Sequence, residues 1–169
     1  MDTPQLILVI GLPGSGKTTF SRALAERIQA FHLNTDIIRD KVGMRGQYGP
    51  EAKKRIYDLM LLEARKSLRE KKTVILDGTF YLEQMRETYR QLAFAERLPL
   101  KWIELIASES VIRERTSHQR TYSEADFSVY QQVRDHFEPF SDARLTLQSD
   151  HRDNLPQMLD RAVQYVAQK

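Results

Sequence analysis

Residues 11–18 read Gly-Leu-Pro-Gly-Ser-Gly-Lys-Thr, and this stretch decides the fold. It is a complete G-x-x-x-x-G-K-S/T phosphate-binding loop. The apolar run Leu6–Ile10 leads directly into it, and apolar residues at helical spacing follow it at Phe20, Leu24 and Ile28. A strand before the loop and a helix after it are the context that this motif requires. The sequence therefore predicts a nucleoside-triphosphate site.

The residues of the loop have expected roles in holding a triphosphate. The glycines let successive backbone N–H groups turn inward around the phosphates, Lys17 reaches the β- and γ-phosphates, and the Thr18 hydroxyl ligates Mg²⁺. The alternative is a glycine-rich turn that happens to carry a lysine, and the flanking strand and helix count against it. The predicted nucleotide-binding residues are Gly11, Pro13, Gly14, Ser15, Gly16, Lys17, Thr18 and Thr19.

The composition fits one globular domain. The chain has 169 residues, of which 41% are hydrophobic, and no run of residues is long and apolar enough to span a bilayer. The chain has no cysteine, which excludes disulfides and thiolate metal sites and fits a reducing cytoplasm. The amino terminus shows no basic region or cleavage site typical of an export signal. We therefore expect a single cytoplasmic domain over residues 1–169, with no membrane association.

Charge and histidine content add little to this picture. The net charge of +3 mildly favours an anionic substrate but falls well short of a protein that coats nucleic acid. The four histidines, His32, His118, His136 and His151, are scattered along the chain. We interpret them as ordinary surface or core residues and not as a metal site.

Strand-like apolar runs alternate with helical stretches along the chain. This alternation favours a parallel sheet covered by helices on both faces, with ligands at the carboxyl ends of the strands. We therefore predict a three-layer α/β/α fold with a five-stranded parallel sheet. The expected strands are 6–10, 31–34, 73–76, 100–106 and a weaker one at 144–147. The expected helices are 17–30, 37–42, 50–70, 83–97, 109–115, 124–137 and 155–168.

Two carboxylates end predicted strands. Asp77 follows the apolar run Val74-Ile75-Leu76 and is the expected Walker B residue, holding Mg²⁺ or its water shell. The next residue is Gly78, where motor and remodelling ATPases usually place a water-activating glutamate. That difference favours phosphate transfer to an acceptor over hydrolysis.

The other carboxylate is Asp36, which follows the second predicted strand, with Arg39 one helical turn later. Asp36 could accept the proton of an acceptor hydroxyl as general base, and Arg39 could hold an acidic group of the acceptor. The alternative is that Asp36 only caps the helix 37–42 and that Arg39 is a solvated charge.

Three segments resemble the P-loop kinases grouped around the 5′-polynucleotide kinase domain, the AAA_33 family, which includes zeta-toxin-like kinases. They read Gly-Leu-Pro-Gly-Ser-Gly-Lys-Thr-Thr-Phe, Thr-Asp-Ile-Ile-Arg and Ile-Leu-Asp-Gly-Thr-Phe. The resemblance implies that Asp36 is the general base and that Arg39 contacts the acceptor. It also implies substrate-binding roles for Thr79 and Arg86, within a D-(A/G/T)-T-(N/F) element followed by an arginine. Phe80 stands where polynucleotide kinases often have asparagine.

The segment 109–123 resembles the arginine-bearing lid of that family. A closing guanidinium stabilises the transferring phosphoryl group, and Arg115 and Arg120 are the candidates for this catalytic role. Arg113 is interpreted as solvated. The alternative is a pair of arginines on a helix surface that balance neighbouring glutamates.

These observations predict an ATP- and Mg²⁺-dependent kinase that acts on a hydroxyl group. The acceptor is either a small molecule or the 5′ end of a nucleic acid, and no obligate protein partner is evident. The basic region 53–72 could track nucleic acid, although its mixed charges are more typical of a solvated helix face. The rival from another class is a nucleotide-binding regulatory module, or weak ATPase, whose lid motion a partner reads.

Overall fold

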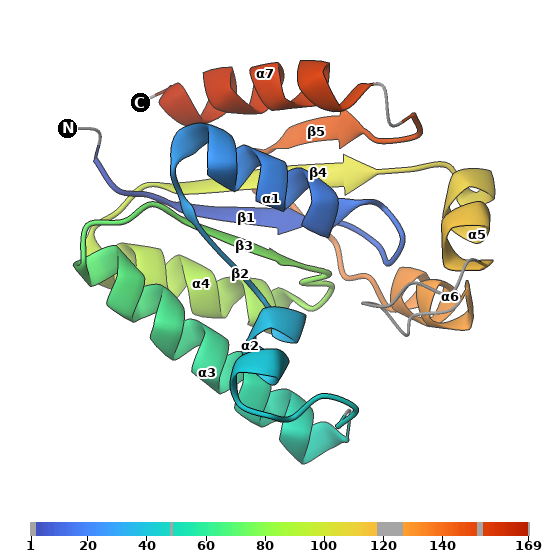
Figure 1. Ribbon diagram of the computed structural model, residues 1–169, viewed down its shortest axis with the longest axis horizontal. Coiled ribbons are helices and arrows are strands. Elements are labelled where there is room, and N and C mark those ends of the chain that lie inside the picture. Colours follow the sequence, from blue (N-terminus) through green and yellow to red (C-terminus); the bar gives the residue numbers. More distant parts are fainter. Residues whose placement is uncertain (1–2, 48, 118–126, 152–153, 169) are drawn as a thin grey trace.

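The computed structural model describes residues 3–47, 49–117, 127–151 and 154–168. Within them, five parallel strands form one sheet in the order β2-β3-β1-β4-β5 (Figure 1). The strands are β1 Leu6–Ile10, β2 Phe31–Asn34, β3 Val74–Gly78, β4 Leu100–Ile106 and β5 Leu145–Gln148. The helices are α1 Lys17–Ile28, α2 Thr35–Lys41, α3 Pro50–Arg69, α4 Glu83–Glu96, α5 Glu109–Ser117, α6 Phe127–Asp135 and α7 Leu155–Ala167. The predicted five-stranded parallel sheet is confirmed.

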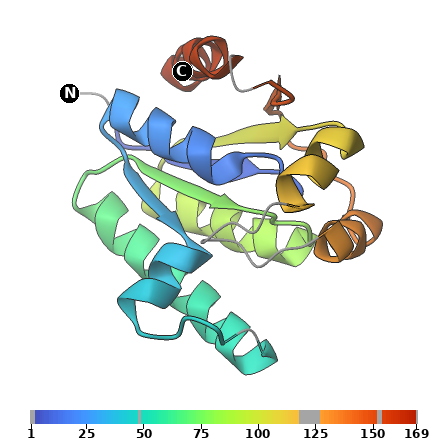
Figure 2. The same cartoon turned by 45° about the vertical axis from the view of Figure 1, so that its right-hand side comes forward.

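The helices cover both faces of the sheet, so the domain has three layers (Figures 1 and 2). One apolar cluster joins the sheet to α3 and α4 through residues such as Met60 and Leu92. A second joins the opposite face to α1 and α7 through Leu24 and Leu159. The strand β1 lies between the two clusters, and all five of its residues are buried. This explains why β1 is a continuous apolar run, as strands buried on both faces are.

The observed boundaries differ from the predicted ones where a side chain or a turn decides them. Helix α2 begins at Thr35, two residues earlier than expected, because the side chain of Asn34 caps it by accepting the N–H of Ile37 at 2.8 Å. Asp36 therefore lies in the first turn of α2, and the alternative that it is the cap is wrong. The expected helix 124–137 begins outside the described residues.

No helix among the described residues has both the length and the apolar character to cross a membrane. The carboxyl ends of the strands meet at one edge of the sheet, where the loop of residues 11–16 leaves β1. In the parallel register, Asp77 of β3 lies between Asn34 of β2 and Val9 of β1. The fold thus gathers the phosphate-binding loop and both predicted carboxylates at a single edge.

Candidate active site

The phosphate-binding loop has the backbone shape that a cradle of N–H groups needs. Gly14 and Gly16 adopt left-handed conformations, with φ of 81° and 88°, which residues with a side chain rarely adopt. Gly11 lies so close to β4 that an added Cβ would be 2.4 Å from the carbonyl oxygen of Leu105. Gly16 occupies the N-cap position of α1 and offers no side-chain cap. The first N–H groups of α1 therefore have no side-chain cap, an arrangement that suits the binding of a phosphate.

Lys17 lies within this loop. Its Nζ donates to the carbonyl oxygen of Leu12 at 2.8 Å, and the residue is half-buried. Burial lowers the pKa of Lys17 to about 8, while the Asp77 carboxylate opposes that shift. The ammonium group thus lies at the loop and interacts with the carboxylate of Asp77 near the end of β3.

Asp77 faces Thr18 across the gap between β3 and α1. The Thr18 hydroxyl donates to Asp77 Oδ1 at 3.1 Å. The other carboxylate oxygen, Oδ2, accepts from the Asn34 amide at 3.1 Å and contacts Nε2 of His32. Asp77 is only 4% exposed. The two predicted metal ligands are therefore adjacent, and His32 is the neighbour that sequence reasoning missed.

Asp36 and Arg39 lie on α2 beside this group. Arg39 is buried, and its Nη1 donates to Asp36 Oδ1 at 3.4 Å. Burial raises the pKa of Asp36 above its ordinary value; Arg39 opposes the shift and Asp77 adds to it. Burial also raises the pKa of Tyr57 to about 12, with smaller effects from the charges of Tyr81, Arg39 and Asp36. Tyr57, on α3, is therefore a second neighbour that the sequence did not reveal.

The structure places Arg86 in the interior. Its side chain is 0% exposed, and its guanidinium donates to the backbone oxygens of Phe80, Glu138 and Pro139. It also pairs with Glu83 at 3.0 Å. In this conformation no part of Arg86 is exposed to an acceptor, and the side chain ties α4 to the segment after α6. This placement differs from the substrate contact expected for Arg86. A buried guanidinium whose partners are backbone carbonyls stabilises the fold.

Thr79 and Phe80 lie in the segment that connects β3 to α4, the helix that carries Arg86. Phe80 is fully buried and packs edge-on against Tyr89, with ring centroids 5.3 Å apart. Phe80 is therefore a core residue. Thr79 is half-buried at the carboxyl end of β3, one position after Gly78.

Helix α5 packs directly against the phosphate-binding loop. A Cβ added at Gly14 would meet Ile112 at 3.1 Å and Thr116 at 3.2 Å. Arg115 donates from Nη1 to the carbonyl oxygen of Gly14 at 3.2 Å and from Nη2 to that of Ser149. Arg115 thus reaches the loop, and its catalytic role in a lid stays a prediction; Arg120 lies outside the described residues.

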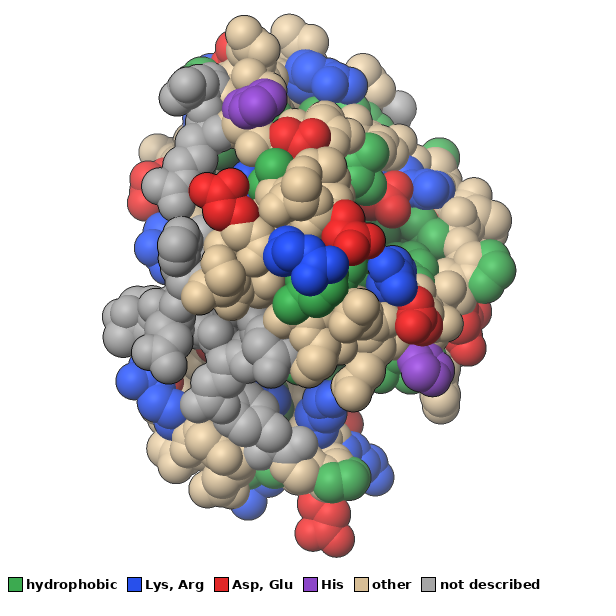
Figure 3. Space-filling view, turned by 90° about the vertical axis from the view of Figure 1, so that its right-hand side faces the viewer, with side chains coloured by type: hydrophobic (Ala, Val, Ile, Leu, Met, Phe, Trp, Pro, Cys, Tyr) green, Lys and Arg blue, Asp and Glu red, His purple; other side chains and the backbone are tan. Residues whose placement is uncertain are grey.

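Arg113 faces away from the loop. Its side chain is 60% exposed, pairs with Glu109 at 3.0 Å and stacks over the ring of Phe127 at 3.8 Å. Figure 3 looks onto the end of the molecule that carries α5 and α6, where positive and negative side chains are interspersed. This agrees with the solvated role expected for Arg113.

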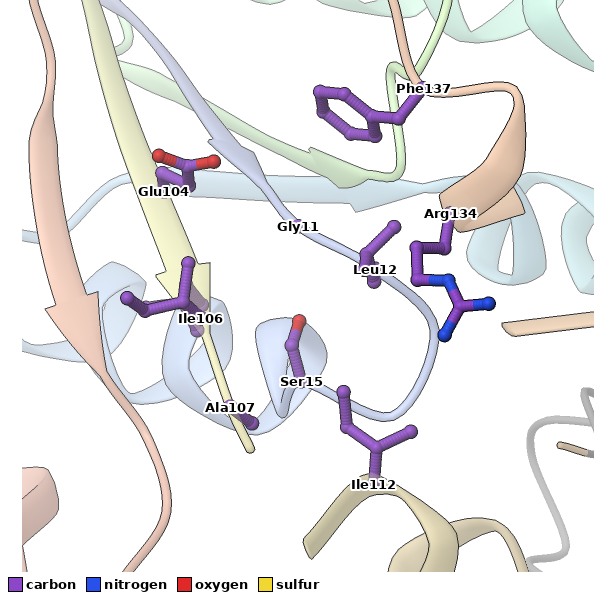
Figure 4. A pocket seen from close by; sticks show the side chains of 10 residues that line it. Gly11, Leu12, Ser15, Glu104, Ile106, Ala107, Ile112, Arg134 and Phe137 are labelled. Carbon is purple, nitrogen blue, oxygen red and sulfur yellow. The ribbon is translucent and has the colours of Figure 1, made fainter. Parts of the chain in front are cut away.

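A cavity of about 190 Å³ lies between the phosphate-binding loop, the end of β4 and α5 and α6 (Figure 4). Its walls include Leu12 and Ser15 from the loop, Ile112 from α5, and Arg134 and Phe137 at the end of α6. The Ser15 hydroxyl is buried and has no hydrogen-bond partner among the described residues. The phosphate-binding loop, α5 and the end of α6 thus leave a small space between them.

The site residues also fit a magnesium ion of the kind that accompanies a nucleotide. No cluster of three or more His, Cys, Asp or Glu in the described part of the chain could hold a metal alone. Magnesium at a nucleotide site needs only one or two protein oxygens, because phosphates and water complete its shell. The hydroxyl of Thr18 and the carboxylate of Asp77 are hard oxygen ligands held 3.1 Å apart. They are therefore suited to that ion.

Curated relatives match parts of this chain. An adenylate kinase from Campylobacter curvus is 32% identical over 125 residues, which cover 66% of each protein. The uncharacterized protein Rv2004c of Mycobacterium tuberculosis is 36% identical over 103 residues, covering 54% of this chain. This chain spans only 21% of that relative's length.

Solved structures share the fold over nearly the whole chain. A gluconokinase from Sinorhizobium meliloti has a TM-score of 0.68 and 20% identity, with 99% of this chain and 94% of that chain covered. Kti12 from Chaetomium thermophilum, in complex with ADP-AlF3, has a TM-score of 0.71 and 21% identity, with 96% and 100% covered.

The family comparison agrees with these likenesses. Residues 6–140, which run from the start of β1 to a point just beyond α6, match the AAA_33 family, described as an AAA domain. The chain therefore belongs to the AAA_33 family and has the fold of P-loop kinases.

Proposed function

We propose that this protein is a phosphotransferase that moves the γ-phosphate of ATP, with Mg²⁺, to a hydroxyl group of an acceptor. The observation that carries this proposal is the position of Asp36. It lies on the first turn of α2, next to Arg39 and close enough to Asp77 for that charge to raise its pKa. A carboxylate placed to act as a base for an acceptor has a use in transfer to a hydroxyl, whereas a nucleotide switch needs no acceptor base.

In the proposed reaction, the loop and Lys17 hold the triphosphate while Thr18 and Asp77 hold Mg²⁺. When bound, the ion neutralises charge on the β- and γ-phosphates. Asp36 accepts the proton of the acceptor hydroxyl, whose oxygen forms the new bond to the γ-phosphorus as the bond to the β-phosphate oxygen breaks. The products are ADP and the phosphorylated acceptor. The raised pKa of Asp36 makes it a stronger base than an ordinary aspartate.

Arg115 and Arg120 are proposed to stabilise the transferring group when the lid closes. The contact between Arg115 and the Gly14 carbonyl supports this, because it places a guanidinium within reach of the loop. Arg39 is proposed to position the acceptor, and Thr79 to contact it at the end of β3. Arg86 then acts indirectly, by fixing the segment after α6.

The acceptor is better explained as a small molecule than as a nucleic-acid end. Three basic side chains of the 53–72 region lie beside carboxylates: Arg65 and Arg69 beside Glu96, and Lys72 beside Glu70. Paired surface charges of this kind contribute little attraction to a polyanion. The rival function, a regulatory module, would use the same nucleotide contacts with no acceptor.

The test is a screen of ATP consumption and acceptor phosphorylation with purified protein. The panel contains sugars, nucleosides, aminoglycosides and oligonucleotides with a 5′-hydroxyl. We expect Mg²⁺-dependent phosphorylation of a small hydroxyl compound and little activity on oligonucleotides. Oligonucleotide phosphorylation at high efficiency would instead select the nucleic-acid acceptor. Tight ATP binding without transfer to any acceptor would support the regulatory module.

A further inference from the structure

Two side chains of β2 contact one oxygen of the Asp77 carboxylate. His32 Nε2 and Asn34 Nδ2 both contact Oδ2, the latter at 3.1 Å. The opposite oxygen, Oδ1, faces the hydroxyl of Thr18 at 3.1 Å. The two oxygens therefore have different environments, one surrounded by protein donors and one directed at the phosphate-binding loop.

The parallel register explains how one strand supplies both donors. Asn34 lies opposite Asp77, and His32 lies opposite Ile75, two residues earlier on each strand. Residues two apart in a strand point to the same face of the sheet. Both side chains therefore project to the face that packs against α1, and the longer imidazole reaches along the strand to the carboxylate.

This arrangement fixes which carboxylate oxygen can bind a cation. An ionised carboxylate only accepts hydrogen bonds, so the imidazole must carry its proton on Nε2. Two donors occupy the lone pairs of Oδ2, whereas Oδ1 accepts from the Thr18 hydroxyl alone among the described residues. The His32 side chain is 10% exposed and Asp77 is 4% exposed, so little water competes for these contacts. Removing one donor would let the carboxylate rotate.

We propose that His32 is a positioning residue of the magnesium site. By holding Oδ2 together with Asn34, it keeps Oδ1 beside the Thr18 hydroxyl, where the two oxygens can share one ion or its water shell. The inference rests on the proposed use of Asp77 and Thr18 for Mg²⁺. Partners that orient a metal ligand in this way typically change metal affinity or activity by roughly 10–100-fold when they are removed.

Two variants separate this role from simple packing. His32→Phe keeps a planar ring in the buried position and removes the donor. His32→Gln places an amide N–H close to the position of Nε2 and retains the donor. Binding of the non-hydrolysable analogue AMPPNP would be measured by calorimetry, first in EDTA and then over a series of Mg²⁺ concentrations. Thermal unfolding in EDTA monitors the fold of each variant.

For His32→Phe we expect unchanged AMPPNP affinity in EDTA and a roughly 10–100-fold higher Mg²⁺ concentration at the midpoint of its effect. His32→Gln should restore most of the Mg²⁺ response. An unchanged midpoint in folded His32→Phe would overturn the proposal. So would equal loss of the Mg²⁺ response in folded His32→Gln, since the donor would then not be what matters. If His32→Phe fails to fold, His32→Leu, which also removes the donor, takes its place, and the same two outcomes support or overturn the proposal.

The measurement uses no acceptor and no turnover, so it is separate from the proposed transferase activity. If the Mg²⁺ midpoint of His32→Phe is shifted and the wild-type protein phosphorylates no acceptor, the positioning role is supported and the transferase proposal fails. If the midpoint of His32→Phe equals that of wild type and the wild-type protein phosphorylates an acceptor, the positioning role is refuted and the transferase proposal stands.

Discussion

Replacing Asp36 with asparagine tests the chemistry of the site with little change in shape. The substitution keeps the size of the side chain and removes its ability to accept a proton. It should also leave α2 in place, because the N-terminus of this helix is capped by the side chain of Asn34. Its principal structural loss is the 3.4 Å pairing with Arg39, which is long for a hydrogen bond.

The expected effect is large on transfer and small on binding. Loss of a general base typically lowers a rate by about 10²–10⁴-fold, which corresponds to about 3–5 kcal/mol in the activation free energy. Affinity for Mg²⁺ and ATP should persist, because Lys17, Thr18 and Asp77 are unaltered. The fall should therefore appear in kcat, with little change in the KM for ATP.

The stability of Asp36→Asn should depend on pH. Burial raises the pKa of Asp36 in the folded protein, so the ionised carboxylate opposes folding at neutral pH. This opposition weakens as the pH falls through the folded pKa, and it is absent below the ordinary aspartate pKa of about 4. We therefore expect a modestly higher Tm for Asp36→Asn than for wild type at pH 7, and a difference that disappears in acid.

Asp40→Asn is the matched control, because Asp40 lies on the same helix and pairs with Arg45 at the surface. It should leave transfer unchanged. The assays are acceptor phosphorylation, calorimetric ATP titration and thermal unfolding between pH 4 and 7, a range set by the ordinary aspartate pKa of about 4. Full transfer by Asp36→Asn would refute the general-base role. Joint loss of stability and activity would instead identify Asp36 as a structural residue.

Three further substitutions and one control variant test the remaining roles. Lys17→Ala should abolish productive ATP binding, since Lys17 is the loop side chain expected to supply a point charge at the β- and γ-phosphates; wild-type affinity and turnover would exclude the nucleotide site. Arg115→Ala should lower turnover more than ATP affinity, while the exposed Arg113→Ala should change neither, and full turnover in Arg115→Ala would exclude its lid role. Arg86→Leu should lower the free energy of unfolding in urea by about 3–5 kcal/mol, because buried carbonyls lose a charged donor. A stable variant with a raised KM for the acceptor would instead return Arg86 to the substrate site.

The sequence predicted the architecture well where local pattern and tertiary packing agree. The loop motif requires a strand before it, and Leu6–Ile10 forms that strand with all five residues buried. The other strands were identified as short apolar runs, and their ends shifted by one or two residues at β3 and β5. Such ends depend on pairing with a neighbouring strand, which a single-sequence pattern does not contain.

The roles of individual polar residues were harder to predict than the elements. Arg86 follows a motif element, and its charge pointed to a substrate role. Its burial depends on carbonyls of Glu138 and Pro139, more than 50 residues later in the chain. The sequence of β2 gives no sign of a role for His32. The register between β2 and β3 brings its side chain to Asp77. Contacts between distant segments therefore decide both roles.

The side chain of Asn34 bears on both possible roles of Asp36, as the cap of α2 and as a general base. An aspartate at the start of a helix is a favoured cap as well as a plausible base, so the residue type of Asp36 fits both roles. The neighbouring amide resolves the competition: its Oδ1 caps α2, while its Nδ2 donates to Asp77. One buried side chain thus links the helix that carries Asp36 to the carboxylate facing the phosphate-binding loop. Because Asn34 provides the cap, the Asp36 carboxylate is not needed for that purpose, which is consistent with its proposed role as general base.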